Sequence, residues 1–322
     1  MEKSGIAVAG SILVDKINEI SRYPECGELT QIAKIDKAVG GCVPNVAIDL
    51  KKISSDVEIS AIGKVGDDVD GEFVKSEMQK SGVNVDGFKV TENDLTSFTE
   101  VMSVKGGQRT FFTYAGASAD FGVDDIDFDN LNCKILHLGY FLLLAKVDNG
   151  DGEKILKKAS EIGIKTSIDL VSENSDRYAC VLPCLKYTDY LIINEIEAGK
   201  LAGIEPTDEN LEAIAYKLKG LGVREKVVIH KFDRAVCLSD EGYSVMAAYD
   251  VPREYIKGKT GAGDAFCAGT LIGIYKNLSD EQILDLASAC AIMALGAPDA
   301  TSGLVSGEKA LDFCKNLGRM KI

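Results

Sequence analysis

Apolar runs of strand length alternate with amphipathic stretches of helix length along most of the chain. The first run, Gly5–Val14, predicts a buried strand. The pattern beyond it predicts helix Pro44–Ile53, strand Val57–Ile62, helix Asp70–Ser81, strand Ile135–Leu138, helix Gly152–Glu161, strand Lys165–Asp169, helix Asp176–Leu185, strand Tyr190–Ile193, helix Glu195–Leu201, helix Asp208–Leu218, strand Lys226–His230 and two final helices at about 263–275 and 280–295. Repeated strand–helix units are typical of a mostly parallel sheet covered by helices on both faces, so an α/β fold is predicted.

Two stretches, at about 15–39 and 96–114, break this rhythm. In the second, the β-prone runs SFTEVMSV and RTFFTY flank Gly106-Gly107, which predicts a β-hairpin. We expect both stretches to form a small inserted sheet over the carboxyl ends of the main strands, where open α/β sheets bind ligands. Because no linker is long enough to separate two domains, residues 1–322 are predicted to form a single domain carrying these lid segments.

Composition narrows the function classes. The 322 residues are 27% charged and 46% hydrophobic, which excludes a disordered chain, and apolar runs such as Phe141–Ala145 are far too short to span a membrane. The net charge of −14 repels nucleic acid and anionic membranes, so neither is an expected partner. An anionic substrate would have to bind in a local electropositive pocket.

The spacing of the cysteines and histidines does not match a metal-binding motif. The nine cysteines are scattered without a CxxC motif, and the N-terminus lacks the features of a signal peptide, so we expect reduced thiols in a cytoplasmic protein. His137 and His230 fall in different predicted strands and are interpreted as packed strand residues.

The most informative stretch is KTGAGDAFCAG, residues 259–269, where small residues precede an apolar helical run. Small side chains let the backbone amides at a helix N-terminus approach an anion closely, and the helix dipole favours negative charge there. Asp264 in the first turn is either a helix cap or a carboxylate aimed at a hydroxyl that attacks a bound phosphate. A P-loop is excluded because it needs glycine at Arg253, and no GxGxxG follows the first strand.

These residues resemble the PfkB/ribokinase family of carbohydrate and nucleoside kinases over essentially the whole chain. The resemblance rests on three motifs in the family's order: the GAGDAF stretch, the pair Gly40-Gly41 followed by Asn45, and an Asn-x-x-Glu formed by Asn194 and Glu197. It implies a three-layer α/β/α ribokinase-like fold with a small β-sheet lid. Members often dimerise through that lid, so a homodimer is expected by analogy.

The resemblance also implies residue roles on the nucleotide side. Asp264 would be the general base, and the backbone amides of Gly261, Ala262 and Gly263 would form the anion hole for the γ-phosphoryl group of ATP. Asn194 would position phosphates. Glu197 would hold Mg²⁺, in part through water.

On the acceptor side the implied residues are Asp15, Gly40, Gly41 and Asn45, which suit a polyol because carboxylate and amide groups bind hydroxyls. Arg109, on the predicted lid, is a further candidate. The expected activity is ATP-dependent phosphorylation of a hydroxyl, expected to be a primary alcohol, of a small sugar. A nucleoside kinase of the same family and a non-catalytic sugar- or nucleotide-sensing protein stay open as alternatives.

Departures from the family pattern keep these alternatives open. The Asp-Thr that often precedes the motif is Gly258-Lys259 here, and the glycine-containing nucleotide segment is replaced by HKFDRA at residues 230–235. Ribokinases have a lysine where this chain has Cys42. Because Asp helps relatives to hold K⁺, we hypothesise that the charge of Lys259 replaces that ion, and the need for a monovalent cation stays undecided.

Overall fold

The computed structural model describes residues 3–104, 109–173 and 175–322. Within them a large sheet has the strand order β13-β12-β11-β10-β9-β8-β1-β4-β5. Its strands are β1 (Ile6–Gly10), β4 (Ile59–Gly66), β5 (Asn84–Thr91), β8 (Ile135–Phe141), β9 (Lys165–Leu170), β10 (Tyr190–Asn194), β11 (Lys226–His230), β12 (Arg234–Ser239) and β13 (Gly242–Ala247). Pairing is parallel from β5 to β11, and only β12 and β13 add antiparallel pairs.

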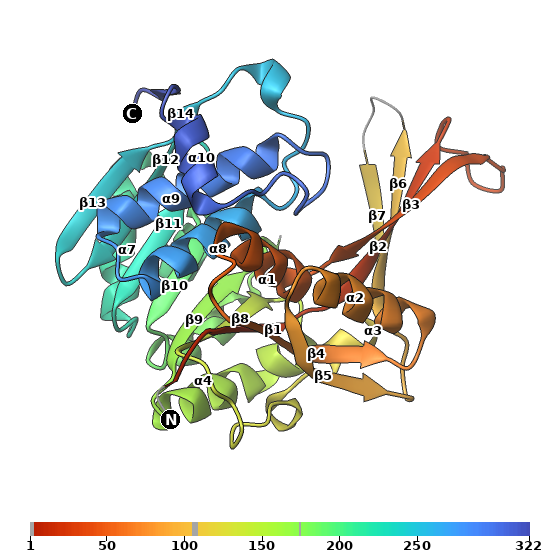
Figure 1. Ribbon diagram of the computed structural model, residues 1–322, viewed down its shortest axis with the longest axis horizontal. Helices are drawn as coiled ribbons and strands as arrows, with labels where there is room; N and C mark the ends of the chain where they lie inside the picture. The colour runs from red at the N-terminus through yellow and green to blue at the C-terminus, as the bar shows by residue number, and fades with distance from the viewer. Residues whose placement is uncertain (1–2, 105–108, 174) are drawn as a thin grey trace.

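Helices cover both faces of this sheet, as the sequence predicts (Figure 1). One face carries α1 (Cys42–Ile53), α2 (Val69–Lys80), α8 (Ala262–Tyr275) and α9 (Asp280–Leu295), whose apolar residues share a core with alternate residues of β1. The other face carries α4 (Gly152–Glu161), α5 (Leu182–Leu185), α6 (Glu195–Ala202) and α7 (Leu211–Gly220). Two further helices are α3 (Gly116–Ala119) and α10 (Gly307–Cys314), and a short pair joins β14 (Tyr249–Asp250) to β15 (Gly318–Arg319).

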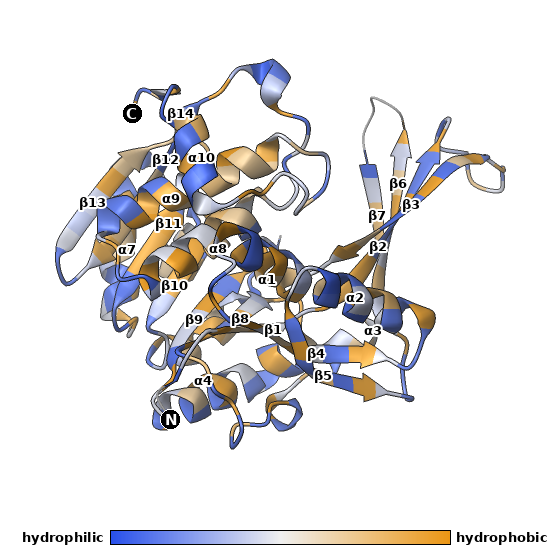
Figure 2. Ribbon diagram, viewed as in Figure 1, coloured by the Kyte–Doolittle hydropathy of each residue, from blue (hydrophilic) through white to orange (hydrophobic). Residues whose placement is uncertain are grey.

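Hydrophobic residues follow this layering: the central strands β10 and β11 and the helix α8 are mainly apolar in Figure 2. Strands that are buried on both faces need such runs, because neither face meets water. No helix in the described part of the chain is long and apolar enough to cross a membrane.

The predicted small sheet is present and projects from the main body (Figure 1). Its strand order is β3-β2-β6-β7, formed by β2 (Leu13–Ile20), β3 (Ile32–Gly40), β6 (Ser97–Val104) and β7 (Arg109–Tyr114). The hairpin pairing of β6 with β7 is confirmed, while its turn at Gly106-Gly107 lies outside the described residues. Lys16 and Lys37 of this sheet both form ion pairs with Asp70 of α2, at 2.9 and 2.6 Å, which join the sheet to the main body.

Three sequence predictions are corrected. The run Gly5–Val14 is divided between β1 and β2, which lie in different sheets, because the chain turns at Ser11 and Ile12. The helix predicted at Asp176–Leu185 is a 3-10 turn, Arg177–Val181, followed by the short α5. The pattern also missed β5, the hairpin β12–β13 and α10.

Local chemistry explains where several helices begin. α9 starts at a capping box in which the Ser279 hydroxyl and the Gln282 side chain each bond to the other residue's amide. α1 starts at Gly41, whose φ of 88° favours glycine and lets the chain turn sharply from β3 into the helix. The start of α1 places Asn45 beside Asp264, around which the candidate site forms.

Replacing Gly10 should destabilise the fold. Its φ is 137°, and a Cβ there would lie 2.6 Å from the carbonyl oxygen of Gly139 on the neighbouring strand. We expect Gly10→Ala to lower the free energy of unfolding by about 1–3 kcal/mol, as overpacking typically does, in urea unfolding followed by circular dichroism. Gly220→Ala is the control, since nothing lies within 4 Å of the new Cβ. Equal stability of the two variants would contradict the prediction.

Candidate functional site

The candidate site lies where four adjacent parallel strands end. Tyr140 of β8, Asp169 of β9, Asn194 of β10 and His230 of β11 come from successive strands of the large sheet. They line a cavity of about 250 Å³ together with Glu197, Gly261, Gly263, Asp264 and Cys267. The cavity therefore joins the carboxyl edge of the sheet to the N-terminus of α8, the place where α/β sheets bind ligands.

Asp264 is held in this cavity by two neutral donors. Its side chain is buried, at 6% exposure, in the first turn of α8. Asn45 Nδ2 donates to Oδ2 at 2.9 Å, and the Tyr140 hydroxyl lies 2.9 Å from Oδ1 and 3.0 Å from Oδ2. Burial raises the pKa of Asp264 to about 6, the charge of Asp169 raises it as well, and the two hydrogen bonds oppose this rise.

Tyr140 and Asp169 connect the strand ends to Asp264. Tyr140 has a φ of 62°, an uncommon conformation for a residue other than glycine, and its amide donates to Asp169 Oδ1 at 2.6 Å. The other oxygen of Asp169 lies 3.4 Å from His137 Nε2. Backbone strain of this kind persists where surrounding contacts determine it, and here those contacts are hydrogen bonds to two buried carboxylates.

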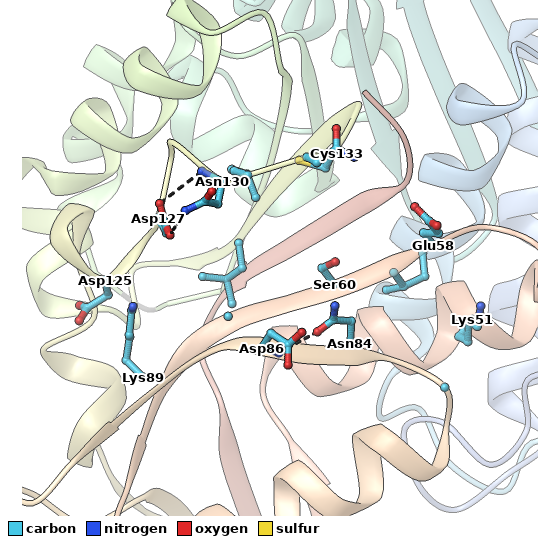
Figure 3. Close-up of a pocket in the computed structure, with 16 residues that line it drawn as sticks. Lys51, Glu58, Ser60, Asn84, Asp86, Lys89, Asp125, Asp127, Asn130 and Cys133 are labelled. Atoms are coloured by element: carbon cyan, nitrogen blue, oxygen red, sulfur yellow. Dashed lines mark hydrogen bonds between the residues drawn. The ribbon is translucent and has the colours of Figure 1, made fainter. Parts of the chain in front are cut away.

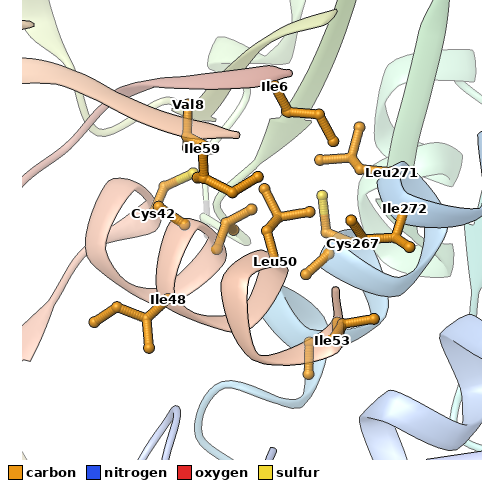
Figure 4. Close-up of a cluster of buried hydrophobic side chains, with 14 of the residues drawn as sticks. Ile6, Val8, Cys42, Ile48, Leu50, Ile53, Ile59, Cys267, Leu271 and Ile272 are labelled. Atoms are coloured by element: carbon orange, nitrogen blue, oxygen red, sulfur yellow. The ribbon is translucent and has the colours of Figure 1, made fainter. Parts of the chain in front are cut away.

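Cys42, His137 and Asp169 lie close together below this cavity, with ligand-type atoms within 4.8 Å of one another. His137 is already engaged by Ser167 through Nδ1 and by Asp169 through Nε2, so these contacts account for the cluster without a metal. Figure 4 shows Cys42 and Cys267 among the apolar side chains of the core between α1 and α8. His137 is thus a packed, hydrogen-bonded strand residue, in agreement with its sequence interpretation.

Asn194 and Glu197 form a capping box at the start of α6. The Asn194 side chain accepts from the Glu197 amide at 2.9 Å, and Glu197 Oε2 accepts from the Asn194 amide at 3.1 Å. Ser172 donates to Glu197 Oε1 and accepts from Asn194 Nδ2, both at 2.8 Å. Burial raises the pKa of Glu197 to about 7, so its carboxyl group changes charge near neutral pH.

A second, smaller cavity of about 90 Å³ brings Asp15 and Arg109 together with Phe111 of the small sheet and Thr260 of the loop before α8. Gly40 lies beside Asp15, because a Cβ on Gly40 would be 2.7 Å from Asp15 Oδ2. Burial raises the pKa of Asp15 to about 6. Thr260 and Gly261 are consecutive, so one loop contributes to the lining of both cavities.

The predicted residues thus fall into two groups. Asp264, Gly261, Gly263, Asn194 and Glu197 line the larger cavity, and Asp15 and Arg109 line the smaller one, with Asn45 bonded to Asp264. Gly41 faces Ser11 and caps α1, while Ala262 packs against the core. Lys259 is exposed, and the hypothesis that its charge takes the place of a K⁺ ion stays a prediction.

Sequence reasoning missed Tyr140, Asp169, Ser172 and His230 as members of the site. A usable signal existed for three of them, since Tyr140, Asp169 and His230 stand at or near the ends of predicted strands whose carboxyl ends meet. Burial lowers the pKa of His230 to about 4, so it is neutral at pH 7, and its ring packs 4.8 Å from that of Phe266.

A larger cavity lies elsewhere in the described chain. It has about 670 Å³ and is lined by residues such as Lys51, Glu58, Asn84, Asp86 and Asp127 (Figure 3). Ile59 and Asn84 begin β4 and β5, so this cavity lies near the amino ends of these strands. None of the predicted site residues lines it.

The raised pKa of Asp264 predicts that ionised Asp264 lowers the free energy of unfolding. Its pKa is about 6 in the folded chain against 3.8 for the unfolded reference, so the cost is absent below pH 4, grows as pH rises and is complete above pH 6. At ~1.4 kcal/mol per pH unit this cost is about 3 kcal/mol. We expect Asp264→Asn to raise the thermal unfolding temperature at pH 8 and to raise it much less at pH 4. The control Asp312→Asn, which changes an exposed carboxylate, should leave the unfolding temperature unchanged at both pH values. If Asp264→Asn raises the unfolding temperature equally at both pH values, the raised pKa of Asp264 is contradicted.

Known proteins of similar sequence and structure match this chain over almost its whole length. Ribokinase of Schizosaccharomyces pombe is 26% identical over 316 residues, covering 94% of this chain and 95% of the relative, and adenosine kinase of Saccharomyces cerevisiae is 26% identical over 296 residues, covering 88% and 86%. The solved structure of Arabidopsis thaliana ribokinase complexed with ribose and ATP superposes with a TM-score of 0.83 at 22% identity, over 98% of this chain and 99% of that one. The model of the pfkB family carbohydrate kinases matches residues 4–306. The chain therefore belongs to the pfkB family of carbohydrate kinases.

Proposed function

We propose that this chain transfers the γ-phosphoryl group of ATP to a hydroxyl group, expected to be a primary alcohol, of a small sugar, with Asp264 as the general base. One observation carries the proposal: Asp264 and the glycines that begin α8 line one cavity, and the loop before α8 also lines a second cavity with Asp15 and Arg109. Phosphoryl transfer needs little covalent chemistry from a protein, and it depends on positioning and on electrostatic stabilisation. This arrangement supplies both.

Asp264 would take the proton from the acceptor hydroxyl as its oxygen attacks phosphorus. A pKa of about 6 leaves the carboxylate mostly ionised at pH 7, yet basic enough to accept a proton, which suits a general base. Its two present donors leave lone pairs on the carboxylate for a third partner.

The start of α8 fits a phosphate group. Gly261 has a φ of 79°, and a Cβ there would lie 2.4 Å from Cα of Ala300, so the loop needs glycine. A Cβ on Gly263 would meet nothing closer than His230 Cε1 at 3.8 Å, which leaves room beside the backbone. The amides of Gly261, Ala262 and Gly263 would then stabilise the charge on the transferred group, and the helix dipole adds to this effect. Asn194 would bind phosphate oxygens at the other side of the cavity.

Glu197 is the proposed residue for Mg²⁺. Both of its oxygens accept hydrogen bonds from neighbouring residues, so we infer that it acts on the hydrated ion through water rather than by direct coordination. When bound with ATP, the ion would neutralise phosphate charge, and Glu197 would orient it.

The acceptor would bind in the smaller cavity. Asp15 can accept hydrogen bonds from two hydroxyls, and Arg109 offers donors from the small sheet. Gly40 and Gly41 would let the backbone approach the sugar, and Asn45 would link the acceptor to Asp264. The small sheet would act as a lid that excludes water from this cavity.

Two alternative functions, a nucleoside kinase and a non-catalytic sensor, are each favoured by a specific observation. A nucleoside acceptor is favoured by the similarity to adenosine kinase and by Phe111, which lines the acceptor cavity and could stack on a base. A non-catalytic sensor is favoured by the altered segment at residues 230–235, where Lys231 and Arg234 are engaged in ion pairs with Asp208 and Asp233.

We further propose a homodimer through the small sheet and a cytoplasmic location. Large apolar side chains are exposed on that sheet: Ile35 is 69%, Phe111 61% and Phe112 58% exposed. The nine cysteines are all free thiols, which suits a reducing compartment.

The proposal is tested by screening sugars and nucleosides for thermal stabilisation with an ATP analogue, followed by rate measurements on the best acceptor. Asp264→Asn should then lower kcat by about 10²–10⁴-fold, the range for loss of a general base, while ATP binding by calorimetry stays within a few-fold. Near-normal turnover by this variant would remove Asp264 as the base. Stabilisation by a sugar without any turnover in the wild-type chain would favour the sensor.

Glu197→Gln tests the Mg²⁺ assignment. We expect it to raise the Mg²⁺ concentration needed for half-maximal rate, because the carboxylate charge that orients the hydrated ion is lost. Glu195→Gln, on the same first turn of α6, is the matched control and should leave this concentration unchanged. An equal response of the two variants would argue that Glu197 only caps the helix.

A further inference from the structure

We propose that Tyr140 is a positioning residue for Asp264: its hydroxyl bridges both oxygens of the carboxylate and holds the group aimed into the cavity. The expected effect of Tyr140 on the reaction rate rests on the proposed function. Its effect on the position and pKa of Asp264 depends only on Tyr140, Asp169 and Asp264. Nothing in the sequence motifs marks Tyr140 for this role.

Among the described residues, the hydroxyl of Tyr140 is the only group that is hydrogen-bonded to both carboxylate oxygens of Asp264, at 2.9 and 3.0 Å. Asn45 bonds to Oδ2 alone. A donor that lies between the two oxygens fixes the rotation of the carboxylate about its Cβ–Cγ bond, which one donor on one oxygen does not. Tyr140 therefore determines where the remaining lone pairs point.

The position of Tyr140 is itself fixed by the backbone. Its φ of 62° turns the chain at the end of β8, and its amide is bonded to Asp169 Oδ1 at 2.6 Å. Asp169 is in turn held by His137, whose Nδ1 is bonded to Ser167. The phenol is thus placed by buried strands rather than by a mobile loop, as a precise positioning role requires.

The charges around Asp264 give this contact its importance. The titratable groups that face it are Asp169 of β9, His137 and Tyr140 of β8, Cys42 and Asp49 of α1 and Cys267 of α8. Within the described chain no lysine or arginine forms an ion pair with Asp264 or Asp169. Burial raises the pKa of the Tyr140 phenol well above its ordinary value, so it remains a donor over the whole working pH range.

Removing the hydroxyl should therefore make Asp264 harder to ionise. A hydrogen bond to a charged group corresponds to about a 10-fold or larger change in an equilibrium constant, so Tyr140→Phe should raise the pKa of Asp264 by about 1 or 2. The matched control is Tyr249→Phe, which removes a phenol bonded at 2.5 Å to the carboxylate of Asp285, on the remote side of α9.

The first measurement is the pH titration of carboxyl ¹³C resonances in the full chain, with the Asp264 signal assigned by its loss in Asp264→Asn. We expect the titration midpoint of Asp264 to move to higher pH in Tyr140→Phe and to stay in place in Tyr249→Phe. An unchanged midpoint in a folded Tyr140→Phe variant overturns the proposal. If Tyr140→Phe does not fold, Tyr140→Leu, which also lacks a donor for Asp264, provides the same comparison.

The second measurement is the pH profile of kcat/KM on the acceptor that the screen identifies. In Tyr140→Phe the acid limb should move to higher pH, and the rate should recover toward the wild-type value as pH rises. A loss that is equal at every pH would show a merely structural role and overturn the proposal. A failure of the proposed function can be told apart from a failure of the Tyr140 proposal. If Asp264→Asn is fully active but the pKa of Asp264 still rises in Tyr140→Phe, Asp264 is not the general base, and the role of Tyr140 in holding its carboxylate stands.

Discussion

Asp169 and Asp264 are buried within electrostatic reach of each other, and among the described residues no lysine or arginine forms an ion pair with either; His137 Nε2 lies 3.4 Å from Asp169. Removing two carboxylates from water without a cation is costly, and the structure offsets that cost with neutral donors. Asp169 accepts from the amide of Tyr140, and Asp264 accepts from Asn45 and from the hydroxyl of Tyr140 while standing in the first turn of α8. The junction of β8, β9, α1 and α8 is arranged around these contacts.

This arrangement explains how a strongly acidic chain can act as a kinase of this family. The protein's net charge of −14 repels a nucleotide at long range, so binding has to rely on close-range dipoles. In the proposed function the first turn of α8 would supply such dipoles. A divalent cation bound with the nucleotide would reduce its repulsion by the buried carboxylates.

Periodicity and motifs predicted much of the architecture. The bounds of α9 and β11 agree with the prediction because a capping box and a short β-branched run mark them in the sequence. Asp264, Asn194 and Glu197 were predicted as site residues through the resemblance of their motifs to the family, and the structure places all three along one cavity. Tyr140 was missed because its role depends on a left-handed backbone conformation, which no side-chain pattern predicts. The run Gly5–Val14 was read as one strand because both of its halves are buried and apolar, and hydropathy does not record a change of sheet.

The packing of Gly139 against Cys42 limits how this site can evolve. A Cβ on Gly139 would lie 1.8 Å from Cys42 Sγ and 3.1 Å from Asp169 Oδ1, so the two side chains share one volume. A larger residue at position 139 becomes possible only after position 42 has become smaller, which fixes the order of the two substitutions. The intermediate chain carries a cavity beside Asp169 and bears the stability loss that such a cavity brings.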